Sequence, residues 1–150
     1  MPDEAYELAL RALERRERSS AELEAWLRQR GVGEEEVEAT VAHLVELGQL
    51  DDARFARRYA EDKRELAGWG AERISDALLA RGVPPEHIEA ALAADGVPEQ
   101  IERAAALLVR RSEALGSEAD RARALGYLTR KGYSYEIAHE AIRTFERASG

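Results

Sequence analysis

One short pattern occurs three times in the chain, at a nearly constant interval. In each copy a leucine is followed by a stretch that contains Arg or Lys, and then by a glycine and an apolar residue. The three glycines are Gly31, Gly82 and Gly132, which are 51 and then 50 residues apart. Self-similarity at a fixed period is typical of repeat proteins, in which each unit buries its apolar face against a neighbour. The sequence therefore predicts an elongated binding scaffold rather than a globule around a catalytic pocket.

The composition favours helix along the whole length. Charged residues make up 35% and aromatic residues 6% of the 150 residues, and Ala, Leu, Glu and Arg dominate the chain. These four residue types are among the better helix formers. We expect an all-α fold of three tandem three-helix repeats that form an elongated, curved array, with almost no strand.

Capping residues and glycines set the ends of the predicted helices. Ser19 followed by Glu22 fits a capping box, in which each side chain accepts a hydrogen bond from the other residue's backbone amide. A glycine such as Gly31 suits the left-handed conformation that ends many helices. The predicted repeats are 1–49, 50–96 and 97–150. Their helices are expected near 3–18, 19–31 and 34–47, near 51–68, 71–82 and 84–96, and near 98–115, 117–131 and 134–147.

Apolar residues recur at the same two positions after each of the three glycines. They lie six and ten residues further on, and this spacing of four places both on one face of a helix. We interpret them as core positions of the third helix of each repeat. The pairs are Val37 and Val41, Ile88 and Leu92, and Ala138 and Ile142.

The charge is negative overall but unevenly distributed. The net charge is −8, with 6 basic and 12 acidic residues in 1–50 but 9 basic and 8 acidic residues in 96–150. Non-specific binding to duplex DNA depends on Lys and Arg that neutralise phosphates and release counterions. An acidic chain is therefore a poor candidate for strong DNA binding by bulk charge, although a local basic face is left open.

The absence of certain residue patterns restricts the setting of the protein. The chain has no cysteine, which excludes disulfides and thiolate metal sites and suits a reducing compartment. Residues 1–10 are acidic and lack the apolar core of a signal peptide. No stretch approaches the roughly 20 apolar residues that a bilayer span needs. We expect a soluble, cytoplasmic protein that does not associate with a membrane.

The segment 50–64 stands out because arginines alternate with aromatic residues. One interpretation is an amphipathic helix with a capped start, an aromatic core stripe and a solvated charged face. The other is a basic surface for carboxylates or phosphates, since the planar fork of Arg suits both groups. Residues 54–83 carry 7 basic and 5 acidic side chains, a local excess of positive charge in an acidic protein. Both interpretations stay open on the residues alone.

Four segments in a fixed order carry a family resemblance. They read LDDARFARRYAEDKR at 50–64, Gly-Trp-Gly at 68–70, ERISDALLARGV at 72–83 and RARALGYLTRKGYSYEIAHEAI at 121–142. Together with the opening at 9–52, they make nearly the whole chain similar to the RecX regulatory protein family. This resemblance implies a helical-repeat protein that binds the RecA recombinase, above all its filament on single-stranded DNA. It further implies inhibition of ATP turnover, filament growth and strand exchange in DNA recombination and repair and the SOS response, without catalysis by the chain itself.

The resemblance also points to particular residues of the central repeat. Phe55 and Ile74 match apolar positions of the family pattern and are best interpreted as core. Trp69 stands in a turn where the family often has a basic residue, and an exposed Trp suits a protein-binding anchor. The predicted partner-binding residues are Asp51, Asp52, Arg54, Arg57, Arg58, Lys63, Arg64, Trp69, Arg73 and Arg81.

Other classes of function have weaker support in the sequence. His43, His87 and His139 lie at unequal distances from their repeat glycines and share no ligand spacing, so no metal or other cofactor is expected. No carboxylate pair is singled out, so no enzyme activity is expected. Three short helices with a glycine turn also resemble a DNA-binding helix-turn-helix, and a generic helical-repeat adaptor is a third alternative. Weak direct contact with DNA is left open, and a monomer is our default.

Overall fold

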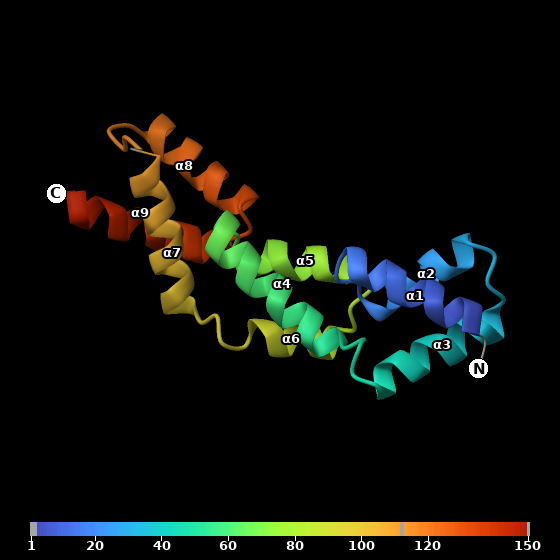
Figure 1. The fold of residues 1–150 in the computed structure, drawn as a ribbon. Coiled ribbons are helices and arrows are strands. Elements are labelled where there is room, and N and C mark those ends of the chain that lie inside the picture. Colours follow the sequence, from blue (N-terminus) through green and yellow to red (C-terminus); the bar gives the residue numbers. More distant parts are fainter. Residues whose placement is uncertain (1–2, 112, 150) are drawn as a thin grey trace. The chain divides into compact units, whose positions relative to one another are not determined.

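The computed structural model describes residues 3–111 and 113–149. Within these ranges all regular elements are α-helices, which confirms the predicted all-α class (Figure 1). None of the described helices is long and apolar enough to cross a membrane. The helices are α1 (Asp3–Arg15), α2 (Ser20–Gln29), α3 (Glu34–Glu46), α4 (Asp52–Ala67), α5 (Ala71–Ala80), α6 (Pro85–Leu92), α7 (Val97–Arg110), α8 (Glu118–Arg130) and α9 (Tyr135–Ser149).

The repeating glycines end the second helix of each group of three, as predicted. Gly31, Gly82 and Gly132 have φ angles of 83°, 79° and 104°, in the left-handed region that only glycine adopts without strain. The capping box at the start of α2 is also confirmed. The Ser19 hydroxyl accepts from the Glu22 amide at 3.1 Å, and a Glu22 carboxylate oxygen accepts from the Ser19 amide at 3.0 Å. Local sequence chemistry therefore fixes these helix ends.

Three of the predicted helix ends differ from the structure by three residues or more. The first helix was expected to end near residue 18, but α1 ends at Arg15. The first helix of the third group was expected to reach Leu115, but α7 ends at Arg110. The Ser117 hydroxyl does cap α8 by accepting from the Asp120 amide at 3.1 Å. The reciprocal bond, however, comes from the amide of Gly116 rather than that of Ser117, so the box is displaced by one residue. Similarly, α6 ends at Leu92 and not near Gly96.

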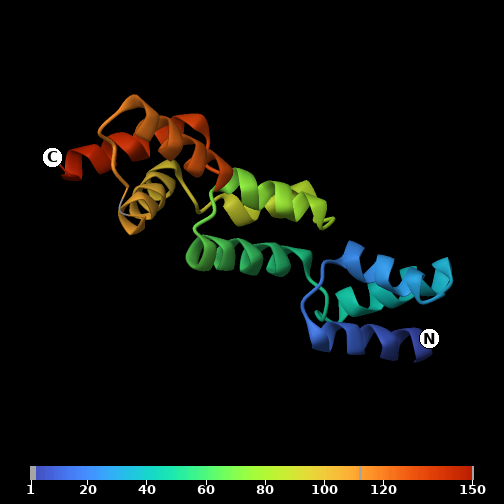
Figure 2. The same ribbon diagram turned by 90° about the horizontal axis from the view of Figure 1, so that it is seen from above.

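Two compact units make up the chain, and their boundaries fall inside α4, inside α5 and before the last residue of α6. The first unit contains the chain up to Arg58 together with Leu78–Ala91. In it α1, α2 and α3 pack side by side, as both ribbon views show (Figure 2). Phe55 is 5% exposed in this unit, which confirms its predicted place in the core. Its central apolar cluster is formed by Ala9, Ala12, Leu23, Leu27, Val37, Val41, Leu44 and Leu50.

The second unit contains Tyr59–Ala77 and the chain from Leu92 onward. In it α9 packs against both α7 and α8. Ile74 is fully buried, as predicted, and so is Tyr133, the largest side chain of the buried set. The predicted core pair Ala138 and Ile142 lies in the apolar cluster of this unit, whereas Leu92 is only half-buried. Each unit thus has its own core.

Candidate functional site

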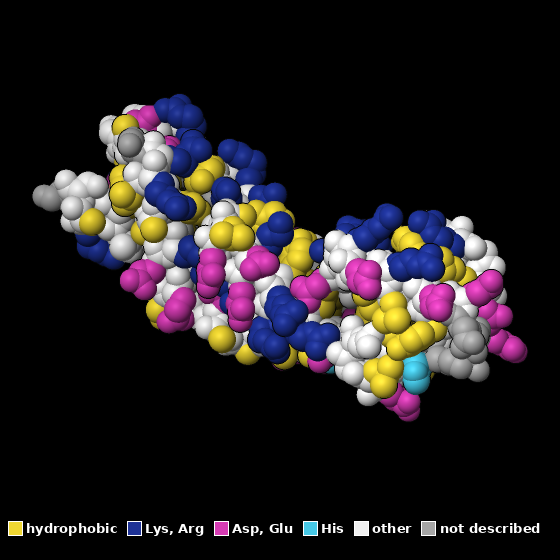
Figure 3. All heavy atoms as spheres, viewed as in Figure 1, with side chains coloured by type: hydrophobic (Ala, Val, Ile, Leu, Met, Phe, Trp, Pro, Cys, Tyr) yellow, Lys and Arg dark blue, Asp and Glu magenta, His cyan; other side chains and the backbone are white. Residues whose placement is uncertain are grey.

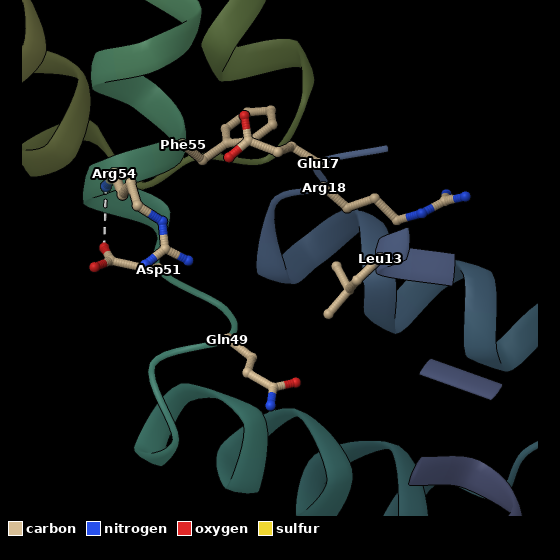
Figure 4. A pocket seen from close by; sticks show the side chains of 7 residues that line it. All are labelled: Leu13, Glu17, Arg18, Gln49, Asp51, Arg54 and Phe55. Atoms are coloured by element: carbon tan, nitrogen blue, oxygen red, sulfur yellow. Dashed lines mark hydrogen bonds between the residues drawn. The ribbon is translucent and has the colours of Figure 1, made fainter. Parts of the chain in front are cut away.

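A small groove lies at the start of α4, where the family-like motif begins. It has a volume of about 180 Å³, and all its lining residues belong to the first unit. A groove of this size is below the roughly 300 Å³ of ordinary ligand pockets, so it fits the tip of a side chain better than a cofactor. Figure 4 shows the lining residues, which are Leu13, Glu17, Arg18, Gln49, Asp51, Arg54 and Phe55.

The rim of this groove is charged and its base is partly apolar. Asp51 caps α4, because its Oδ1 accepts a hydrogen bond from the Arg54 amide at 3.0 Å (Figure 4). That backbone hydrogen bond is the main reason why the pKa of the Asp51 carboxyl lies below its ordinary value. Asp51 is exposed and Arg54 is half-buried, whereas Phe55 is buried beneath them. The groove can therefore offer both a carboxylate and a guanidinium to a partner.

Two other predicted residues of the first unit hold its helices together. Asp52 Oδ1 accepts from the Ser20 amide at 2.8 Å, which satisfies a free donor at the start of α2. Arg81 donates from Nε and Nη2 to the two Glu22 carboxylate oxygens, at 2.9 and 3.0 Å. Its guanidinium also lies 4.7 Å from the centre of the Phe55 ring. These contacts give Asp52 and Arg81 a structural role.

Two arginines of the first half of α4, Arg57 and Arg58, face solvent. Figure 3 shows Lys and Arg side chains gathered over this part of the helix. Arg57 is exposed and makes no ion pair with the residues that the structure describes. Arg58 is exposed too, and its Nη1 lies 2.7 Å from Oε1 of Glu17 on the rim of the groove. Arg57 therefore has the more available guanidinium of the two.

The second unit contains a separate cluster of cations around an aromatic ring. The Arg73 guanidinium carbon lies 4.0 Å and Lys63 Nζ lies 4.8 Å from the centre of the Trp69 indole. Tyr59 meets the same ring edge-on, with the ring centres 6.4 Å apart. Arg64 behaves differently, because its Nε lies 3.4 Å from Oδ2 of Asp95 and its side chain is only 16% exposed. Lys63, Trp69 and Arg73 thus form a surface cluster, and Arg64 is structural.

Sequence reasoning missed four of the seven residues that line the groove. Leu13, Glu17, Arg18 and Gln49 precede the motif and come from α1, the α1–α2 loop and the α3–α4 loop. No motif or spacing marks them, because packing alone brings them to the start of α4. Within 3–111 and 113–149 no group of three His, Asp or Glu side chains is suited to hold a metal ion.

Comparison with protein families identifies both early parts of the chain. The family model for the first three-helix domain of RecX matches residues 5–44, and that for its second three-helix domain matches residues 51–92. A regulatory protein RecX of Thermus thermophilus is 38% identical over 143 residues, which cover 95% of this chain and 93% of that protein. The regulatory protein RecX of Mycolicibacterium vanbaalenii is 36% identical over 149 residues, which cover 93% of this chain and 81% of that protein.

Solved structures agree in fold. A crystal structure of RecX from Lactobacillus salivarius matches with a TM-score of 0.86 over 96% of each chain, at 23% identity. A second crystal structure, of a regulatory protein RecX, matches with a TM-score of 0.79 at 24% identity and covers 91% of this chain and 69% of that one. At these identities the two structures show only the fold, whereas the family models and the more similar relatives show the family. This chain belongs to the RecX family of regulatory proteins.

Proposed function

We propose that this protein binds the RecA recombinase filament on single-stranded DNA and restrains its ATP turnover, growth and strand exchange. The observation that carries the proposal is the similarity to proteins named regulatory protein RecX over nearly the whole chain. Those relatives are named as regulators and not as enzymes. The chain then acts by occupying a surface of its partner, as a cytoplasmic monomer without a cofactor.

We propose one contact patch in each unit, made of the predicted residues that remain accessible. In the first unit these are Asp51 and Arg54 at the groove, with Arg57 and Arg58 beside them on α4. In the second unit they are Lys63, Trp69 and Arg73. Guanidinium and ammonium groups suit the carboxylates of a protein as well as the phosphates of a nucleic acid. Asp52, Arg64 and Arg81 contribute indirectly, because they hold the helices that carry the others.

Direct binding to DNA is the main alternative to binding the filament. The net charge of −8 opposes binding to a polyanion at long range, whereas the local basic residues favour it at contact. Binding to a nucleoprotein filament is compatible with both electrostatic effects, because the protein component of the filament supplies contacts that DNA alone lacks. We therefore assign at most a weak direct contact with DNA.

The proposal is tested by measuring the ATPase activity of RecA on single-stranded DNA as this protein is titrated to a stoichiometric excess. Binding to labelled single-stranded DNA without RecA, and to RecA without DNA, is measured in parallel. We expect the ATPase rate to fall and binding to be tightest when RecA and DNA are both present. An unchanged ATPase rate contradicts the inhibitory function. Equally tight binding to bare DNA supports the alternative.

A further inference from the structure

The backbone of the turn that carries Trp69 is fixed on both sides. The Trp69 amide donates to the Lys63 carbonyl at 3.0 Å, and the Trp69 carbonyl accepts from Arg103 Nε at 3.3 Å. The amides that follow donate to the loop before α9, from Gly70 to the Lys131 carbonyl at 2.8 Å and from Glu72 to the Gly132 carbonyl at 3.0 Å. The indole is therefore presented from a backbone that has little freedom to move.

A buried polar network of the second unit stands behind this turn. Asp95, whose side chain is 2% exposed, accepts from both terminal nitrogens of Arg103 at 2.9 Å. Arg103 Nε also donates to the Tyr133 hydroxyl at 3.1 Å, and that hydroxyl donates to the Gly68 carbonyl at 2.6 Å. Burial raises the pKa of Tyr133, so its hydroxyl stays protonated and remains a donor. A satisfied network of this kind makes the turn rigid.

Close backbone packing adds to this rigidity. A Cβ on Gly70 would lie 2.4 Å from the Gly132 carbonyl oxygen, and a Cβ on Gly132 would lie 2.3 Å from Cβ of Arg73. Only glycine at both positions lets the turn and the loop before α9 approach so closely. The same contact places Arg73, at the start of α5, against the Trp69 ring.

The two cations beside the indole keep most of their hydrogen-bonding capacity. A guanidinium has five N–H donors, and within the described ranges Arg73 uses its Nη1 for one bond, to the Arg130 carbonyl at 3.3 Å. Lys63 forms no ion pair with a described carboxylate. Both cations lie against aromatic rings, which hold them in place through cation–π attraction. Figure 3 shows hydrophobic and basic side chains next to one another over this end of α4.

We propose that Trp69, flanked by Lys63 and Arg73, is a preorganised anchor for an acidic segment of the protein partner. This inference rests on the proposed function, because the partner is the recombinase of the filament. Carboxylates match the remaining N–H donors, and the uncovered part of the indole offers apolar contact to the stem of an acidic side chain. A nucleobase fits less well, because stacking on the indole must displace a guanidinium that lies 4.0 Å from the ring centre. Preorganisation lowers the entropic cost of docking.

The test uses the full chain with RecA filaments on single-stranded DNA. Trp69→Ala leaves the main-chain bonds of the turn in place, and we expect it to weaken filament binding about tenfold or more, as for a central aromatic anchor. The double variant Lys63→Gln, Arg73→Gln should weaken binding as well and reduce its dependence on salt. Circular dichroism checks that each variant keeps the helical content of the parent. Trp26→Phe, which leaves Trp69 as the one remaining tryptophan, reports directly on the anchor through its fluorescence.

The outcomes separate this inference from the function on which it rests. We expect the Trp69 emission to change when filaments are added and to stay constant with single-stranded DNA alone. If the parent binds filaments and Trp69→Ala binds within about twofold of it, the proposed role of Trp69 is contradicted, although the proposed binding to filaments is supported. An equal emission change with bare DNA means that the ring contacts nucleic acid, which overturns the acidic partner. If the parent itself fails to bind filaments, both the function and the anchor fall.

Discussion

Side chains of the same type serve different purposes in this protein. Arg81 forms a two-bond pair with Glu22, and Arg64 pairs with the buried Asp95, so both stabilise the fold. Arg57 instead faces solvent without an ion pair to a described residue. The sequence could not separate these arginines, because their partners lie far away along the chain and no local pattern announces them.

The capping carboxylate of α2 makes stability depend on pH. Burial raises the pKa of Glu22, but the hydrogen bonds from Arg81 and from the Ser19 amide outweigh it, so the folded-state pKa is lowered. A lowered pKa adds stability above the unfolded-state pKa of about 4.3 and loses it as the pH falls through the folded-state pKa. Glu22→Gln should therefore reduce the free energy of unfolding at about pH 7, on the order of 1 kcal/mol.

This difference should shrink as the pH falls through the lowered folded-state pKa of Glu22, because the parent carboxylate then also becomes protonated. Urea unfolding of the parent and of Glu22→Gln at neutral pH and at a series of acidic pH values measures it. The matched control is Glu14→Gln, because Glu14 is exposed on α1 and should show little effect at any of these pH values. A difference between Glu22→Gln and parent that does not depend on pH contradicts the assigned role of the carboxylate.

At the scale of elements, local sequence signals predicted helix starts and glycine-terminated helix ends better than they predicted features that depend on tertiary packing. The cap at Ser19 and the left-handed glycine at Gly31 act within one turn of helix, and both were found as predicted. The predicted end of α7 was wrong, because the apolar spacing continues to Leu115 although the helix stops at Arg110. The groove at the start of α4 was not predictable as a whole, since Leu13 and Gln49 reach it only through packing.

The exposed face of α4 is the element for which a surface test is sharpest. Arg57→Glu reverses a charge without breaking a described ion pair, so we expect it to weaken filament binding several-fold, mainly through the association rate. Circular dichroism should stay that of the parent. Arg11→Glu is the control, because Arg11 is an exposed arginine of α1 outside the predicted surface. Equal effects of Arg57→Glu and Arg11→Glu would indicate non-specific charge, and an unchanged affinity would move the contact away from α4.

For the whole molecule, the sequence period and the compact units divide the chain differently. The period predicts boundaries near residues 50 and 96, and the family models end at residues 44 and 92. The compact units instead divide inside α4 and α5, so each of these helices contributes residues to both. Periodicity reflects which segments share one sequence pattern, whereas compactness depends on which side chains pack together. The division into three repeats therefore stays a prediction about the sequence, and the units describe the packing.

Shared helices predict that the two units unfold together. The part of α4 in the first unit ends at Arg58, and a helical stretch of that length has little stability alone. Loss of either core therefore removes support from a helix that the other unit uses.

The two tryptophans allow a direct test, because Trp26 belongs to the first unit and Trp69 to the second. In urea, the fluorescence transitions of Trp69→Phe and Trp26→Phe should each coincide with their circular dichroism transitions. Leu23→Ala in the first core should cost about 2 to 5 kcal/mol and lower the midpoint reported by Trp69 as much as that reported by Trp26. A Trp69 midpoint that Leu23→Ala leaves unchanged would show that the units unfold independently.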